Sequence, residues 1–189
     1  MANFTVIYDA NVLYPAPLRS LLVYLATTGL FRARWTEEIH HEWIRNLLIK
    51  RPDLSVAQLN SVKEQMNLAV PDSLVTGYQR ITAGLTLPDP DDRHVLAAAL
   101  KANAELIITA NLKDFPDAAL KEFNISAQHP DEFILDLLDL NQEAVLNCLK
   151  AARTHYRNPQ LSVSDYLDCL QRQGLVKTTE YLSPYSKRL

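Results

Sequence analysis

Acidic residues gather just before an apolar stretch in the segment LPDPDDRHVLAAAL, residues 87–100. Asp89, Asp91 and Asp92 lie there almost side by side. One such residue is enough to cap a helix, because a side-chain oxygen accepts from free backbone N–H groups and its charge complements the helix dipole. The surplus carboxylates indicate a second role, which is to hold a metal ion through oxygen ligands.

Three further acids lie where a folded chain would bring them toward the same place. Asp9 follows the apolar run at residues 4–8, Glu42 lies in a segment of helical spacing, and Asp114 follows the apolar stretch ELIITAN. Carboxylates held close together repel, so at neutral pH they take up protons or recruit a cation. Mg²⁺ and Mn²⁺ prefer oxygen ligands and activate water for attack on a phosphodiester. The pattern predicts hydrolysis that needs no His, Cys or Lys nucleophile.

Each of these acids also has a purely structural interpretation. Asp9 alone would be a turn or capping residue, and Glu42 could pair with Arg45 or Asn46 on one helix face. Four acids at one predicted edge are harder to explain by capping, so we interpret the set as functional.

Helical phase separates Asp92 from its two acidic neighbours. Asp92 aligns with Leu96 and Ala99 on the buried face of the predicted helix, whereas Asp89 or Asp91 is placed to be the N-cap. We therefore expect Asp92 to be the acid that this segment contributes to the site.

Strand and helix patterns alternate through the first two thirds of the chain. This order predicts a parallel sheet covered by helices on both faces, with ligands bound outside the carboxyl ends of the strands. The predicted strands are residues 4–8, 32–35, 105–111 and 124–128, and the predicted helices are 15–30, 36–51, a helix from Ser55, a helix ending at 100, and 117–123. That edge of the sheet is where Asp9 and the loop after Ile108 are expected.

The pattern changes after Pro130, where three amphipathic helices are predicted with no strand between them. They cover residues 132–140, 143–156 and 166–175, the last capped by Ser162. We expect residues 1–130 to form one domain and 131–189 a C-terminal helical extension.

Bulk composition excludes several other classes of protein. The formal net charge is -3, so the overall charge of the chain does not by itself indicate nucleic-acid binding. The two cysteines, Cys148 and Cys169, lack zinc-site spacing, and His40, His41 and His94 have no HxxxH pattern, so we expect neither a zinc site nor a disulfide framework. No apolar run is long enough for a membrane span, and a cytoplasmic protein is expected.

Six basic residues lie on or near the first two long helices, where they either line an RNA groove or simply solvate helix faces. They are Arg19, Arg32, Arg34, Arg45, Lys50 and Arg51.

Taken in order, the motifs IYDANVL, EEIHHEW, DPDDRHVLAAAL and ELIITANLKDFP resemble those of PIN-domain ribonucleases close to the VapC-type toxins. The resemblance covers residues 4 to about 128, and the helical tail is similar to that of one VapC-like subgroup. It implies a three-layer α/β/α domain with a central parallel sheet, in which Asp9, Glu42 and Asp92 bind the metal. Asp114 or Asn111 would complete the catalytic set.

The match is less tidy at the fourth acidic position. The family often has an aspartate two residues after the threonine of this strand, whereas Asn111 follows Thr109 and Ala110 here. A neutral amide adds no charge, which leaves open whether one or two metal ions bind. Asn11, Thr109 and Asn111 are expected to contact substrate or orient the acids.

The function that the resemblance implies is a Mg²⁺- or Mn²⁺-dependent endoribonuclease, the toxin of a toxin–antitoxin pair. Its partners would be RNA, a cognate antitoxin protein and a second copy of the chain, with no membrane. The alternative is a catalytically silent PIN-like module that binds RNA or protein. A haloacid-dehalogenase-like phosphatase is disfavoured, because Asp9 is followed by Ala10 and Asn11 and not by a second aspartate.

Overall fold

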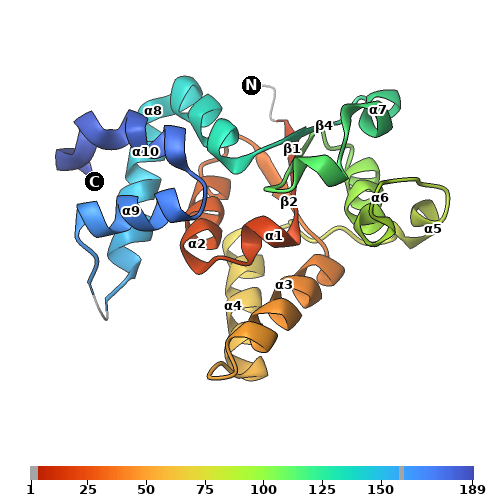
Figure 1. Ribbon diagram of the computed structural model, residues 1–189, viewed down its shortest axis with the longest axis horizontal. Helices are drawn as coiled ribbons and strands as arrows, with labels where there is room; N and C mark the ends of the chain where they lie inside the picture. Colours follow the sequence, from red (N-terminus) through yellow and green to blue (C-terminus); the bar gives the residue numbers. More distant parts are fainter. Residues whose placement is uncertain (1–3, 158–159) are drawn as a thin grey trace.

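The computed structural model describes residues 4–157 and 160–189, and its centre is a sheet of four parallel strands (Figure 1). The strands are β1 (Thr5–Tyr8), β2 (Arg32–Arg34), β3 (Leu106–Ile108) and β4 (Ser126–Gln128). Their order is β2-β1-β3-β4, so β1 and β3 are the two inner strands. All three pairings are parallel, which places the carboxyl ends of the strands at one edge.

The inner strands are apolar because helices cover both faces of the sheet. All four residues of β1 are buried, and Ile107 and Ile108 of β3 are fully buried. In Figure 1, α2 and α8 lie on the left of the strands and α6 lies on the right. The predicted three-layer α/β/α arrangement is therefore confirmed. Parallel strands that are buried on both faces have continuous apolar sequences, as the two inner strands do.

Helices account for most of the remaining chain. Four short 3₁₀ helices are η1 (Pro90–Asp92), η2 (Leu112–Asp114), η3 (Lys121–Phe123) and η4 (Ser183–Arg188). The α-helices are α1 (Ala10–Leu13), α2 (Ala16–Ala26), α3 (Glu37–Lys50), α4 (Val56–Ala69), α5 (Gln79–Thr82), α6 (Arg93–Ala102), α7 (Asp117–Leu120), α8 (Pro130–His155), α9 (Val163–Arg172) and α10 (Val176–Leu182).

Local capping explains where the two helices α3 and α4 begin. The Thr36 side chain accepts from the backbone N–H of Ile39 at the start of α3. Ser55 and Gln58 form a reciprocal capping box at the start of α4. Both starting points were predicted from the sequence, because a capping oxygen three residues before the accepting N–H is a local pattern.

The C-terminal helices differ from the prediction in one respect and agree in another. The helix α8 spans residues 130–155 but is interrupted by a kink at Asn141 (φ -157°, ψ 84°). The two predicted helices therefore lie on either side of this kink. The Asn141 side chain accepts from the N–H of Ala144 and restarts the helix. The helix α10 was not predicted. No β-strand occurs in the described part of this tail, as expected.

The tail packs directly on the sheet domain and on itself. The ring centroids of Phe31 and Phe133 are 5.1 Å apart, and the Cys148 thiol contacts the carbonyl of Tyr24 on α2. The buried Asp131 carboxylate accepts from the backbone N–H groups of Lys177 and Thr178, which fixes the start of α10 against α8.

No helix in the described ranges is both long and apolar enough to cross a bilayer.

Candidate active site

The candidate site lies at the carboxyl edge of the sheet, where the inner strands β1 and β3 end side by side. Asp9 follows β1, and its backbone N–H donates to the carbonyl of Ile108 over 3.1 Å. Thr109 follows β3, and its hydroxyl donates to the Asp9 carboxylate over 2.8 Å. The parallel register therefore sets the first carboxylate of the site directly beside the next strand.

Asp9 is held by a dense set of hydrogen bonds. Its carboxylate accepts from the N–H of Ala10 at 2.6 Å and from the Asn11 amide at 2.5 Å. The Asn11 amide also donates to the Thr109 hydroxyl at 2.9 Å, and its oxygen accepts from the N–H of Ala110. Asn11 and Thr109 thus orient the carboxylate, which is the second of the two roles that the sequence left open for them.

The surroundings of Asp9 favour its protonated form in the absence of a counter-ion. Burial, helped by the charge of Glu42, raises the pKa of Asp9 to about 6 despite the lowering effect of the hydrogen bonds from Thr109 and Ala10. Only 3% of the Asp9 surface is exposed. A positive ion at this carboxylate would relieve the cost of its charge.

Asp92 and Asp89 have the separate roles predicted from helical phase. Asp89 is the N-cap of η1, and its carboxylate accepts from the N–H of Asp91 at 2.9 Å. Asp92 stands at the start of α6 without a side-chain capping bond, so its half-buried carboxylate is available for another purpose.

Several acids act together on Asp92. Burial and the charges of four other carboxylates together raise the pKa of Asp92 to about 7; these are Asp9, Asp89, Asp114 and Glu42. Asp9 follows β1, Asp89 precedes η1, and the other two lie on η2 and α3, so the four are distant in sequence. The fold therefore does bring the predicted acids toward one point.

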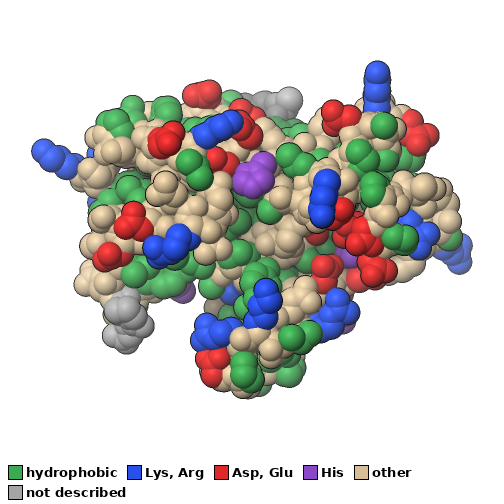
Figure 2. Space-filling model, viewed as in Figure 1, with side chains coloured by type: hydrophobic (Ala, Val, Ile, Leu, Met, Phe, Trp, Pro, Cys, Tyr) green, Lys and Arg blue, Asp and Glu red, His purple; other side chains and the backbone are tan. Residues whose placement is uncertain are grey.

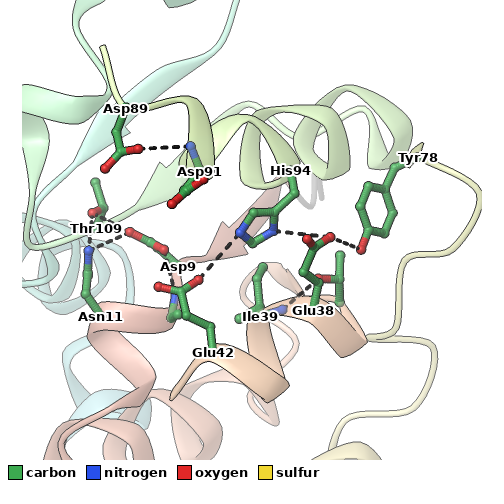
Figure 3. A network of polar contacts seen from close by, with 12 residues as sticks. Asp9, Asn11, Glu38, Ile39, Glu42, Tyr78, Asp89, Asp91, His94 and Thr109 are labelled. Carbon is green, nitrogen blue, oxygen red and sulfur yellow. Dashed lines mark hydrogen bonds and ion pairs between the residues drawn. The ribbon is translucent and has the colours of Figure 1, made fainter. Parts of the chain in front are cut away.

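Glu42 of α3 meets His94 of α6 across the site (Figure 3). The His94 Nε2 lies 3.5 Å from the Glu42 carboxylate, and the Nδ1 lies 3.9 Å from Glu38, which accepts from the Tyr78 hydroxyl at 2.9 Å. Burial lowers the pKa of His94, but the contact with Glu42 and the charges of Glu38 and Asp9 outweigh it and raise the pKa overall. The His94 ring thus contacts the Glu42 side chain from the neighbouring helix.

His94 was assigned no role in the acidic site from the sequence, so its position beside Glu42 was not predicted. It is 6% exposed, and its Nδ1 is the one ring nitrogen among the described residues that is buried without a hydrogen-bond partner. Its spacing two residues after Asp92 was visible in the sequence, but the approach of α3 was not. His40, by contrast, accepts from the Trp43 indole at 3.0 Å and belongs to the core, as expected.

Two side chains share the fourth acidic position. Asp114 is the last residue of η2, and Asn111 directly precedes η2. The Asn111 amide donates to the Asp114 carboxylate in a short contact, and the Asn111 N–H donates to the Thr109 hydroxyl at 3.0 Å. Asp114 is half-buried and adds to the negative field at Asp92. Asn111 thus positions Asp114 toward the acids from the loop that follows β3.

The donor set fits a hard divalent cation. Every candidate ligand is a carboxylate or amide oxygen, as Mg²⁺ and Mn²⁺ prefer. Across residues 4–157 and 160–189, no Lys or Arg forms an ion pair with Asp9, Glu42, Asp92 or Asp114. Within the same residues, no three His, Cys, Asp or Glu side chains are yet arranged as closely as a metal site requires.

Comparison with known proteins places both parts of the chain. A family model described as the PIN domain matches residues 5–113, and one described as the VapC50 C-terminal domain matches residues 130–184. A curated protein of Mycobacterium tuberculosis strain H37Rv, named "Putative ribonuclease VapC50", is 42% identical over 109 residues. That match covers 56% of this chain and 64% of the relative. No solved structure matches the chain.

The first of these family models covers more than half of the chain and includes Asp9 after β1, Glu42 on α3 and Asp92 at the start of α6. The fold agrees with it, since a parallel sheet between helices carries acids at its carboxyl edge. The chain therefore belongs to the PIN domain family.

Proposed function

We propose that this protein is a metal-dependent endoribonuclease that hydrolyses RNA phosphodiester bonds. The observation that carries the proposal is the convergence on Asp92 of carboxylates from four separate elements, without a Lys or Arg ion pair among the described residues. So much negative charge at the ligand edge of a PIN domain is costly unless a cation joins it.

In this mechanism Asp9, Glu42 and Asp92 would hold Mg²⁺ or Mn²⁺. When bound, the ion would supply positive charge that offsets these acids, polarises the phosphoryl group and lowers the pKa of water. Asp114 completes the acidic set, with Asn111 bound to it.

The surrounding residues of the chain set the geometry for this chemistry. Asn11 and Thr109 fix the orientation of the Asp9 carboxylate through bonds of 2.5 and 2.8 Å. His94 holds Glu42 from the opposite side. Fixing such groups before substrate arrives lowers the reorganisation that the reaction requires.

The partners follow from the same proposal. The name of the mycobacterial relative is that of a VapC protein, and we propose that this chain is likewise a toxin held in check by a cognate antitoxin protein in the cytoplasm. A homodimer is also proposed. The two family matches, at 5–113 and 130–184, support a division into a nuclease domain (1–130) and a C-terminal helical extension (131–189).

One observation favours the alternative of a silent RNA- or protein-binding module. Asn111 is neutral at a position where the family resemblance implies an aspartate, so the site carries one charge fewer there. Asp114 compensates for this charge by its field at Asp92.

RNA cleavage with a matched variant tests the proposal. Purified protein is incubated with mixed RNA in Mg²⁺, Mn²⁺ or EDTA, beside Asp92→Asn and the control Asp139→Asn, which makes the same change at an exposed position on α8. Cleavage is expected to require the ion, to be lost in the first variant and to persist in the second. Absence of cleavage together with absence of a saturable heat of Mn²⁺ binding would favour the silent module.

A further inference from the structure

A cavity of about 290 Å³ opens directly beside the candidate active site, between α1 and the exposed side of α3. Glu42 and Asn11 form the end of the cavity that faces the acids. The opposite end is formed by Tyr14, Asn46 and Lys50, which take no part in the mechanism above. A hollow continuous with the reacting centre of a nuclease is where a part of the substrate must lie.

Tyr14 supplies a fixed aromatic surface in this cavity. It is the C-cap of α1, it is half-buried, and the buried Arg19 donates to its carbonyl at 3.1 Å and to that of Leu13 at 2.6 Å. Arg19 itself lies 4.5 Å from the centroid of Trp43, so it belongs to the core and fixes this turn. The aromatic ring is therefore held on a rigid part of the backbone.

Asn46 and Lys50 continue the α3 face that begins with Glu42. They follow it by one and two helical turns, since residues four apart lie above one another on a helix. The Lys50 ammonium is 5.7 Å from the Tyr14 ring centroid. Across the described residues no hydrogen bond engages the Asn46 amide, which leaves its donor and acceptor free for a ligand.

The same face leads away from the acids toward the C-terminal helices. A second cavity of about 590 Å³ shares Tyr14 and Lys50 with the first and extends past Arg51 to Gln173, after α9. Figure 2 shows Lys and Arg side chains over α3 and the turn that follows it, beside the acidic cluster at the junction with α6. The acids are thus flanked on one side by cationic side chains, which include Lys50 and Arg51.

We propose that Tyr14, Asn46 and Lys50 form a nucleotide subsite that takes a nucleobase next to the cleaved phosphate of single-stranded RNA. An unstacked base lies on the Tyr14 ring, Asn46 hydrogen-bonds its edge, and Lys50 turns to a phosphate. This inference rests on the proposed function, because it assigns a specificity site to the same reaction. A duplex does not fit, since its bases are stacked away from side chains.

RNA is favoured over a protein partner by the chemistry of the lining. An aromatic ring, an amide and an ammonium group match the base face, base edge and phosphate of a nucleotide. Ile49 is the one large and strongly exposed apolar side chain that the first cavity adds to these groups.

The test compares Tyr14→Leu and Asn46→Ala with two matched controls. Tyr14→Phe keeps the ring, and Lys101→Met removes a positive charge from the exposed end of α6, outside the cavity. Cleavage positions in a mixed-sequence RNA are mapped for each protein, and KM and kcat are measured on one substrate. Thermal unfolding verifies that every variant is folded.

We expect the unaltered protein to prefer certain bases at one position fixed relative to the cut. Tyr14→Leu and Asn46→Ala should weaken that preference and raise KM by about tenfold, as loss of base stacking does, with kcat little changed. Lys101→Met should behave like the unaltered chain, and Tyr14→Phe, which keeps the ring, should retain the base preference that Tyr14→Leu loses. Equal KM and equal cleavage positions in all five proteins would overturn the subsite.

A binding measurement separates this inference from the proposed function. Fluorescence anisotropy with Asp92→Asn protein compares a labelled single-stranded RNA with an abasic chain of the same length. Introducing Tyr14→Leu into the Asp92→Asn protein should weaken binding of the RNA and leave binding of the abasic chain unchanged. That result without cleavage by the unaltered protein would sustain the subsite and refute the nuclease. Unchanged RNA binding with lost self-association would assign the groove to a protein contact and overturn the subsite.

Discussion

Removing one carboxylate from the site should stabilise the metal-free protein. Asp92 makes no side-chain capping bond, and its surroundings raise its pKa from 3.8 to about 7. Keeping it charged therefore opposes folding at high pH, whereas an asparagine of the same size has no charge to repel. The substitution Asp92→Asn isolates this electrostatic cost.

The magnitude follows from the pKa shift and the exposure of the side chain. Raising the pKa of Asp92 from 3.8 to about 7 corresponds to a free-energy cost of at most about 4 kcal/mol for the charged carboxylate, at about 1.36 kcal/mol for each pH unit. Because Asp92 is only half-buried, solvent screening reduces this to about 2 kcal/mol. Loss of its favourable interaction with the α6 dipole offsets about 0.5–1 kcal/mol. The net gain is about 1 kcal/mol, or about 2–4 °C in Tm for a chain of this size.

The sign of the pH dependence is set by the raised pKa. At pH values well below 3.8 the carboxyl is protonated in both the folded and the unfolded chain, so the substitution has little effect there. Between 3.8 and about 7 the unfolded chain has lost this proton while the folded chain still holds it, so the stability difference grows across this range and reaches its full size above pH 7.

Thermal unfolding in EDTA at pH 5 and pH 8, followed by circular dichroism, measures this difference. Asp139→Asn is the control, because it makes the same chemical change on an exposed face of α8. Added Mn²⁺ should stabilise the unaltered protein at pH 8 and remove the advantage of Asp92→Asn. A variant that is less stable than the unaltered protein at pH 8 in EDTA would refute the electrostatic reasoning.

Three further perturbations test separate parts of the structure. His94→Gln should weaken Mn²⁺ affinity by about tenfold in isothermal titration, because a group that orients a ligand is lost, while the exposed His41→Gln should not. Thr109→Val removes a hydrogen bond that lowers the pKa of Asp9, so the acid limb of the pH–rate profile should move to higher pH; an unmoved limb would contradict the assignment. Asp131→Ala leaves two backbone N–H groups at α10 without their acceptor and should cost about 2 kcal/mol in urea unfolding, with faster proteolysis of the tail; equal proteolysis rates would show that the cap is dispensable.

Much of the site was predictable because its acids obey local rules. Asp9 ends an apolar run, and parallel strands bring such ends together. Asp92 differs from Asp89 in helical phase, and the structure gives Asp89 the cap and leaves Asp92 free. These distinctions depend on neighbouring residues alone, so the sequence contains them.

Other features depend on how elements cross, which a single sequence does not reveal. The contact of His94 with Glu42 exists because α6 and α3 approach each other at one point. The helix α10 has a weak apolar pattern, and its start is fixed by Asp131, 46 residues before Lys177. Short α1 was missed for a different reason, since four residues carry too little periodicity to detect.

The bond between Thr109 and Asp9 makes the site sensitive to the pairing of two strands. The Thr109 hydroxyl reaches the Asp9 carboxylate only when Tyr8 is opposite Ile108, as the register of β1 and β3 has it. A slip of one residue would turn the carboxylate to the other face of the sheet. Chains with mispaired inner strands would consequently lack a competent centre, so the number of metal ions bound per chain would report the fraction of correctly folded molecules in a preparation.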